Sequence, residues 1–253
     1  MPLEIVTVPC LKDNYAYLAH DRATGATACV DVPEAAPVLA ALADRGWRLD
    51  RILITHHHGD HIDGVAAAVA ATGAQVTGAE ADRHRLPPLD TAVAEGDRVD
   101  LGGIAGHVIE VPGHTVGHVA YAFPGAVFTG DSLMALGCGR LFEGTAAQMW
   151  QSLQKLAALP ADTLVCSGHE YAAANARFAL TIDPANPALA DRAARIAAAR
   201  AENRPTVPVR LAEELATNSF LRARDPAIRA QLDLPDAPAA EVFAEIRARK
   251  DRF

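Results

Sequence analysis

The sequence Thr55-His56-His57-His58-Gly59-Asp60-His61 begins at the last residue of segment 51–55, which reads as a short buried β-strand. Its H-x-H-x-D-H pattern brings three imidazoles and one carboxylate into a single short loop. Such a segment packs poorly in an apolar core, whereas imidazole and carboxylate groups are ligands of zinc, iron and manganese. A solvated polar loop is the alternative interpretation. The pattern favours a metal-binding loop at the end of a strand.

Three later segments carry further donors, each next to glycine, which permits the tight turn that aims a side chain into a cleft. They are His114 in Pro112-Gly113-His114, Asp131 in Thr129-Gly130-Asp131, and His169 in Ser167-Gly168-His169. Each follows or lies near the end of an expected strand. Together with the first loop they supply five histidines and two aspartates, which is enough for two metal ions.

The arrangement of expected elements divides the chain. Strand-like and helix-like segments alternate up to about residue 170, which indicates an α/β sandwich with metal-bearing loops at strand ends. The last third is rich in Ala and Arg at helical spacing, interrupted by the extended segment Arg204-Pro205-Thr206-Val207-Pro208. We therefore expect a catalytic domain over residues 1–172 and a small all-helical domain over residues 173–253.

Composition excludes several classes of protein. The 23 Lys plus Arg and 31 Asp plus Glu give a net charge of −8, which offers no basic surface for nucleic acid but leaves a small anionic ligand compatible. No segment reads as a secretory signal or as a membrane span of about 20 apolar residues. The four cysteines have no C-x-x-C spacing, which fits a reducing cytoplasm.

These motifs resemble those of the metallo-β-lactamase superfamily. The resemblance implies that the chain folds as an αββα sandwich. Within this superfamily the chain is similar to the glyoxalase II (hydroxyacylglutathione hydrolase) family nearly end to end. The matching segments are DNYAYL from Asp13, THHHGDH from Thr55, PGHTVGH from Pro112, TGDSL from Thr129, GCGRLFEGT from Gly137, GHEY from Gly168, PTVP from Pro205, AEELATNSFLR from Ala212 and RARKDRF from Arg247.

The resemblance implies roles for the donors. His56, His58 and His114 would hold one divalent ion, Asp60, His61 and His169 would hold the second, and Asp131 would bridge them. Each ion then has three terminal ligands and room for shared solvent, which is chemically consistent. Zinc is the expected metal, and iron or manganese would suit the same donors.

The resemblance also implies a glutathione-binding set: Arg140, Phe142, Tyr171, Arg247 and Lys250. Two of these differ from some relatives. Phe142 stands where those relatives have Tyr, so a hydroxyl contact is lost, and Arg140 replaces a Lys with a planar guanidinium. Without the resemblance, Arg247 and Lys250 would read as a solvated helix end.

The implied reaction is hydrolysis of S-(2-hydroxyacyl)glutathione, chiefly S-D-lactoylglutathione, to glutathione and D-lactate, as in methylglyoxal detoxification. A metal-bridged hydroxide held by Asp131 would attack, and Asp60 would orient it. A thiolate leaves without a strong general acid. We expect a cytoplasmic monomer that acts on a small-molecule thioester, without nucleic-acid or membrane partners.

Three alternatives are weaker. A persulfide dioxygenase on the same fold would use a single iron, and the complete second donor set and the C-terminal tail argue against it. A phosphodiesterase or RNA-processing enzyme would call for a basic surface. A catalytically silent metal-binding protein would be expected to lack a ligand.

Other residues near these motifs read as structural. His57 should point away from its two neighbours, and His118 should support the site from behind. Cys138 has no base beside it in sequence, so we interpret it as a small buried residue and not as a nucleophile.

Overall fold

The computed structural model describes residues 3–253, and their contacts form two compact units. The first contains residues 3–110 and Val116–Gly130; the second contains Val111–Thr115 and Asp131–Phe253. The predicted boundary at residue 172 rests instead on the rise in helix content, and it stays a prediction.

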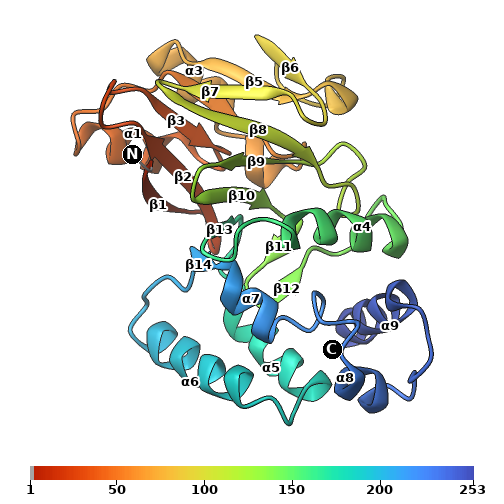
Figure 1. Ribbon diagram of the computed structural model, residues 1–253. Helices are drawn as coiled ribbons and strands as arrows, with labels where there is room; N and C mark the ends of the chain where they lie inside the picture. The colour runs from red at the N-terminus through yellow and green to blue at the C-terminus, as the bar shows by residue number, and fades with distance from the viewer. Residues whose placement is uncertain (1–2) are drawn as a thin grey trace. The chain divides into compact units, whose positions relative to one another are not determined.

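The first unit opens with a six-stranded sheet in chain order (Figure 1). Its strands are β1 (Glu4–Cys10), β2 (Asn14–His20), β3 (Thr27–Val30), β4 (Arg51–Leu53), β5 (Gln75–Ala79) and β6 (Thr91–Val93). Tight turns make β1 to β3 antiparallel, whereas β3 to β6 pair in parallel. Parallel pairing needs crossover segments, and helices α1 (Ala35–Ala43) and α3 (Val65–Thr72) supply the first two.

The core of this sheet explains its apolar strands. Val38 and Leu42 of α1 belong to one buried cluster with Ile52 of β4, and Val65 of α3 joins them. Burying such side chains removes apolar surface from water, at roughly 1.5–3 kcal/mol for each large side chain. The strand before the histidine loop is therefore anchored firmly.

Four more strands complete the first unit as an antiparallel meander: β7 (Arg98–Leu101), β8 (Ile104–Glu110), β9 (Val119–Phe123) and β10 (Ala126–Gly130). The meander faces the first sheet, since the rings of Tyr17 and Phe128 lie 5.8 Å apart. The Tyr121 hydroxyl also donates to the Ile54 carbonyl at 2.8 Å. Two short helical turns, α2 (Gly59–Ile62) and η1 (Glu80–Asp82), follow β4 and β5.

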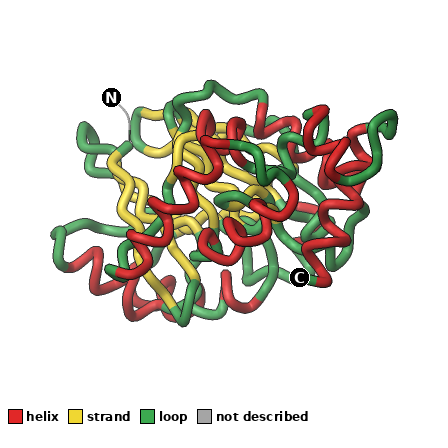
Figure 2. Tube along the Cα trace, turned by 90° about the horizontal axis from the view of Figure 1, so that it is seen from below, coloured by secondary structure: helices red, strands yellow, loops and turns green. Residues whose placement is uncertain are grey.

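The second unit is mainly helical, and Figure 2 shows the C-terminus among helices and loops. Its helices are α4 (Ala146–Ala157), α5 (Ala172–Ile182), α6 (Pro187–Ala201), α7 (Leu211–Thr217), α8 (Pro226–Gln231) and α9 (Ala239–Arg252). Its strands are β11 (Leu133–Met134), β12 (Gly137–Cys138), β13 (Leu164–Ser167) and β14 (Val209–Arg210). Rings of Phe220, Phe243 and Trp150 form part of the core between the helices.

The C-terminal region is helical as expected, apart from one strand of two residues. Strand β14 lies within it and pairs antiparallel with β13. The cause is local, because Pro205 and Pro208 keep the preceding chain extended and deliver it in strand conformation. Among the described residues, no helix is long and apolar enough to cross a membrane.

Candidate metal centre

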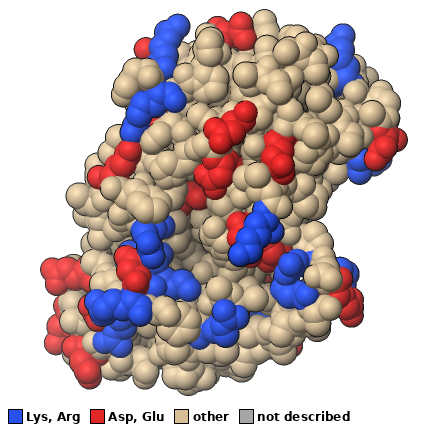
Figure 3. All heavy atoms as spheres, turned by 180° about the vertical axis from the view of Figure 1, so that it is seen from behind, with Lys and Arg blue, Asp and Glu red and all other residues tan. Residues whose placement is uncertain are grey.

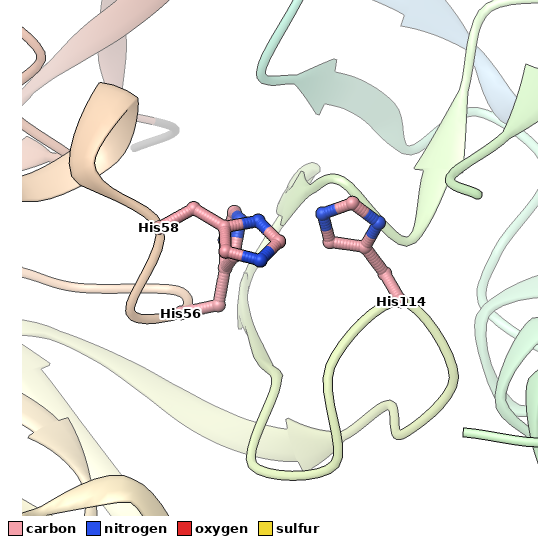
Figure 4. Close-up of side chains that lie close together, drawn as sticks. All are labelled: His56, His58 and His114. Carbon is pink, nitrogen blue, oxygen red and sulfur yellow. The ribbon is translucent and has the colours of Figure 1, made fainter. Parts of the chain in front are cut away.

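The loop after β4 directs two imidazoles to one point. Nε2 of His56 lies 3.2 Å from Nδ1 of His58, and Figure 4 shows both rings turned toward each other. Two nitrogen ligands about 2.0–2.1 Å from a tetrahedral ion would themselves lie about 3.3 Å apart. The pair therefore fits a shared cation. Figure 4 also draws His114, which comes from the loop after β8.

A buried aspartate fixes this loop from behind. One oxygen of Asp31 accepts the Thr55 amide at 2.8 Å, and the other lies 2.8 Å from both the Thr55 hydroxyl and Nδ1 of His61. The Thr55 hydroxyl lies 3.0 Å from Nδ1 of His56. With their Nδ1 atoms engaged, both histidines present Nε2 as the donor, which is how a carboxylate orients a metal-binding imidazole.

The next pair of donors lies on α2. Oδ2 of Asp60 is 3.9 Å from Nε2 of His61. The amide of Asn14 donates to both the carboxylate and the carbonyl of Asp60, each at 3.0 Å. The first unit thus presents two donor pairs, His56 with His58 and Asp60 with His61.

The second unit presents the remaining donors around one carboxylate. Oδ2 of Asp131 lies 3.4 Å from Nε2 of His114 and 3.3 Å from Nε2 of His169. Nδ1 of His114 lies 2.8 Å from the carbonyl of Arg140, to which it donates, so its Nε2 is left as the donor atom. One oxygen of Asp131 therefore lies near both imidazole nitrogens.

Neighbouring groups that were expected to be structural have other contacts. Nδ1 of His57 lies 2.9 Å from Asp82, and the ring also meets that of His58 edge-on, with ring centres 5.0 Å apart. His118 is fully buried and stacks on His56, with ring centres 4.6 Å apart. Burial raises the pKa of the Cys138 thiol to about 11, which suppresses the nucleophilic thiolate.

Two aromatic side chains expected at the substrate lie beside the donors of the second unit. Phe142 is exposed and meets the ring of His114 edge-on at 5.3 Å. Tyr171 stacks on His169, with ring centres 4.6 Å apart. Arg140 is exposed and lies 3.5 Å from Asp251.

The two basic residues of α9 are not a solvated helix end. Arg247 is buried, donates to the Cys138 carbonyl at 3.0 Å and pairs with Asp251 at 2.8 Å. The ammonium of Lys250 lies over the ring of Phe178. Desolvation, with repulsion from Arg247 as the next cause, lowers the pKa of Lys250 below its usual 10.5. These cations are therefore held in place.

Comparison with known proteins identifies the class. The model of the metallo-beta-lactamase superfamily matches residues 24–169. The crystal structure of BLEG-1 B3 metallo-beta-lactamase, 20% identical, superposes with a TM-score of 0.67 over 86% of this chain and 99% of that one, which shows the fold. A crystal structure of ETHE1 from Myxococcus xanthus, 27% identical, superposes with a TM-score of 0.65 over 99% of this chain and 98% of that one. Fold and donor-bearing loops thus define a metallo-β-lactamase superfamily protein.

Closer matches name the family. The model described as "Hydroxyacylglutathione hydrolase C-terminus" matches residues 170–253. A hydroxyacylglutathione hydrolase from Cereibacter sphaeroides is 68% identical over the whole of both chains. The chain belongs to the hydroxyacylglutathione hydrolase family, which is the family that the motifs resemble.

Sequence patterns missed two supporting residues. Asp31 directly follows the buried strand β3, and its signal was an acidic residue after an apolar run. Asn14 lies within the DNYAYL segment, but no spacing links it to Asp60. Both act on residues far along the chain, at separations of 24 to 46 positions.

Proposed function

We propose that this chain hydrolyses S-(2-hydroxyacyl)glutathione thioesters, chiefly S-D-lactoylglutathione, at a centre of two divalent ions. Zinc is the metal we assign first, since the donors are imidazole and carboxylate. The observation that carries the proposal is the placement of Asp131 between two imidazole nitrogens, with two matched donor pairs in the first unit. Full-length identity to hydroxyacylglutathione hydrolases supports the substrate class.

In this proposal His56, His58 and His114 would hold one ion, and Asp60, His61 and His169 would hold the other. Asp131 would be a ligand of both. When bound, such a pair of ions supplies hydroxide at neutral pH and polarises the thioester carbonyl. The chain's own residues set the geometry, because Asp31, Asn14 and the Arg140 carbonyl each fix one donor before substrate arrives.

Substrate recognition falls to the second unit. Arg247 and Lys250 provide cations for the glutathione carboxylates, and Arg140 adds a third positive group from the loop after β12. Tyr171 and Phe142 offer aromatic faces. Because Phe142 lacks a hydroxyl, only its backbone can hydrogen-bond. We propose that the protein acts as a monomer in the cytoplasm. Its four buried free cysteines fit a reducing compartment.

The function is tested with the zinc-loaded protein and S-D-lactoylglutathione, following loss of thioester absorbance. His58→Ala should lower metal content and reduce kcat/KM by roughly a hundredfold or more. His57→Ala is the matched control and should retain both, since His57 bonds Asp82. No turnover by the metal-loaded protein would overturn the proposal. A single bound iron with oxygen consumption on glutathione persulfide would instead favour the dioxygenase alternative.

A further inference from the structure

The β11–β12 hairpin is held mainly by side chains from the surrounding helices. Its two strands are two residues each, so its own pairing is minimal. Every residue from 134 to 138 has one backbone group bonded by a distant side chain. Nδ2 of Asn218 donates to the carbonyls of Met134 and Gly137, at 3.2 and 3.0 Å. Nδ2 of Asn175 donates to the Ala135 carbonyl and Nη1 of Arg247 donates to the Cys138 carbonyl, each at 3.0 Å. The Glu214 carboxylate accepts from the Leu136 amide at 3.0 Å.

The turn of this hairpin needs such support. Leu136 adopts a φ of 55°, in the left-handed region where a side chain with a Cβ is strained. A leucine holds that conformation only where its surroundings fix it, and Leu136 is fully buried. The bond from its amide to Glu214 is the direct restraint.

Glu214 is itself fixed by a buried ion pair. Glu214 on α7 and Arg192 on α6 are both almost fully buried, and the guanidinium donates to the carboxylate. Arg192 also donates to the Thr217 hydroxyl at 2.7 Å, and Asn218 donates to Glu214 at 2.9 Å. A buried pair contributes little net stability, because desolvation offsets its attraction. Here the pair holds the Glu214 carboxylate in place, so that it can accept the hydrogen bond from the Leu136 amide of the hairpin.

The hairpin leads directly into the residues assigned to the site. The backbone of Gly139 packs so tightly that an added Cβ would lie 2.0 Å from the Asp131 carbonyl and 2.9 Å from Nδ1 of His114. The next carbonyl, that of Arg140, accepts from His114, and the Phe142 amide donates to the His114 carbonyl at 3.2 Å. Movement of the hairpin would therefore move both a metal donor and the substrate loop.

We propose that Glu214 and Asn218 are positioning residues for the reaction, with Arg192 holding Glu214 in place. They act through the hairpin on the imidazole of His114 and on Arg140 and Phe142. This assigns the buried part of the AEELATNSFLR segment a role distinct from contact with substrate. The catalytic side of the inference rests on the proposed function; the mechanical side does not.

The test compares Asn218→Ala with Arg195→Ala. The control residue lies one turn along α6 from Arg192 and pairs with Asp191 and Glu213. Glu213 also lies 3.7 Å from Arg192, so this variant perturbs a neighbouring ion pair without removing a hydrogen bond to the hairpin. In Asn218→Ala we expect faster hydrogen exchange of the amides in residues 133–142, and a KM raised roughly five- to tenfold with a smaller change in kcat. Arg195→Ala should match the wild type in both.

Unchanged exchange and KM in folded Asn218→Ala protein would overturn the inference, as would equal effects of the control. If Asn218→Ala does not fold, Asn175→Ala is measured instead, since it removes only the bond to Ala135 and should shift both readouts in the same direction by less. Hydrogen exchange needs no substrate. Failure of the proposed function would therefore leave wild-type protein inactive on the thioester while the exchange difference remained.

Discussion

Asp31 shows how one side chain can set the chemistry of a loop. Its two oxygens bond the backbone and hydroxyl of Thr55 and the imidazole of His61, all in the buried interior of the first unit. Its φ of 56° is one that aspartate tolerates better than most residues. Asp31 therefore restrains the histidine loop through both Thr55 and His61.

Replacing Asp31 with asparagine should weaken metal binding. Asparagine keeps the shape and the backbone conformation, but its amide nitrogen cannot accept from His61. We expect zinc affinity to fall by roughly ten- to a hundredfold, measured by competition with a chromophoric chelator. Asp50→Asn is the control, because the Asp50 carboxylate accepts from the Thr27 amide and pairs with Arg48 in the same unit, and neither is a proposed metal ligand. Equal affinity in both variants would contradict this role.

Lys250 gives a pH dependence with a defined sign. Its pKa lies below 10.5 because burial disfavours the charged ammonium, so its charge is lost at lower pH than that of an ordinary lysine. As the pH rises, glutathione binding should therefore begin to weaken before the pH reaches 10.5. In Lys250→Arg the loss should move to higher pH, because a guanidinium keeps its proton.

Calorimetric titration of glutathione across pH measures this shift. Lys155→Arg, at the end of α4, serves as the control, and comparison between proteins cancels the titration of the ligand itself. Superimposable profiles for Lys250→Arg and wild type would argue against a binding role for the ammonium.

At the scale of elements, local signals predicted what they encode directly. The strand before the histidine loop was predicted over residues 51–55, and β4 begins at Arg51 and ends at Leu53. The β11–β12 hairpin and the short helix α7 were not predicted. Their conformations depend on buried partners, such as Glu214 for the amide of Leu136, and local sequence carries little trace of those.

Helix α4 provides a test of an element's own stability. Thr145 accepts from the Gln148 amide at 3.2 Å, and the Gln148 side chain accepts from the Thr145 amide at 2.9 Å, which forms a capping box. Thr145→Ala should lower the free energy of unfolding in urea by about 1 kcal/mol. Thr181→Ala, which loses a bond inside the last turn of α5, should cost less. A reversed order would contradict the cap.

At the scale of the whole molecule, charge is divided unevenly between the units. The first holds 8 Lys plus Arg against 16 Asp plus Glu, whereas the second holds 15 of each, so the entire net charge of −8 belongs to the first. Figure 3 shows basic groups beside acidic ones at several places on one face. The first unit therefore carries the protein's net negative charge. The second unit, to which we assign glutathione binding, has no net charge but contains the cations proposed to bind it.

Metal removal is the test at this scale. Metal ions bound by the five imidazoles and two carboxylates of the proposed centre would stabilise only the folded protein. Chelation should therefore remove a large stabilising free energy. We expect chelator treatment to abolish thioester hydrolysis and to lower Tm in calorimetry, and we expect added zinc to restore both. An unchanged Tm together with retained activity would contradict a structural and catalytic metal centre.

The sequence by itself predicted a set of metal donors in strand-end loops and indicated the family, because metal ligands and glycine turns are short patterns along the chain. Tertiary structure decided which atoms those donors present. Asp31, Asn14, the Arg140 carbonyl and the buried pair of Arg192 with Glu214 act across gaps of 22 to 46 residues. Such partners are selected by packing and desolvation, which no local pattern encodes, and they turn a list of ligands into an arranged site.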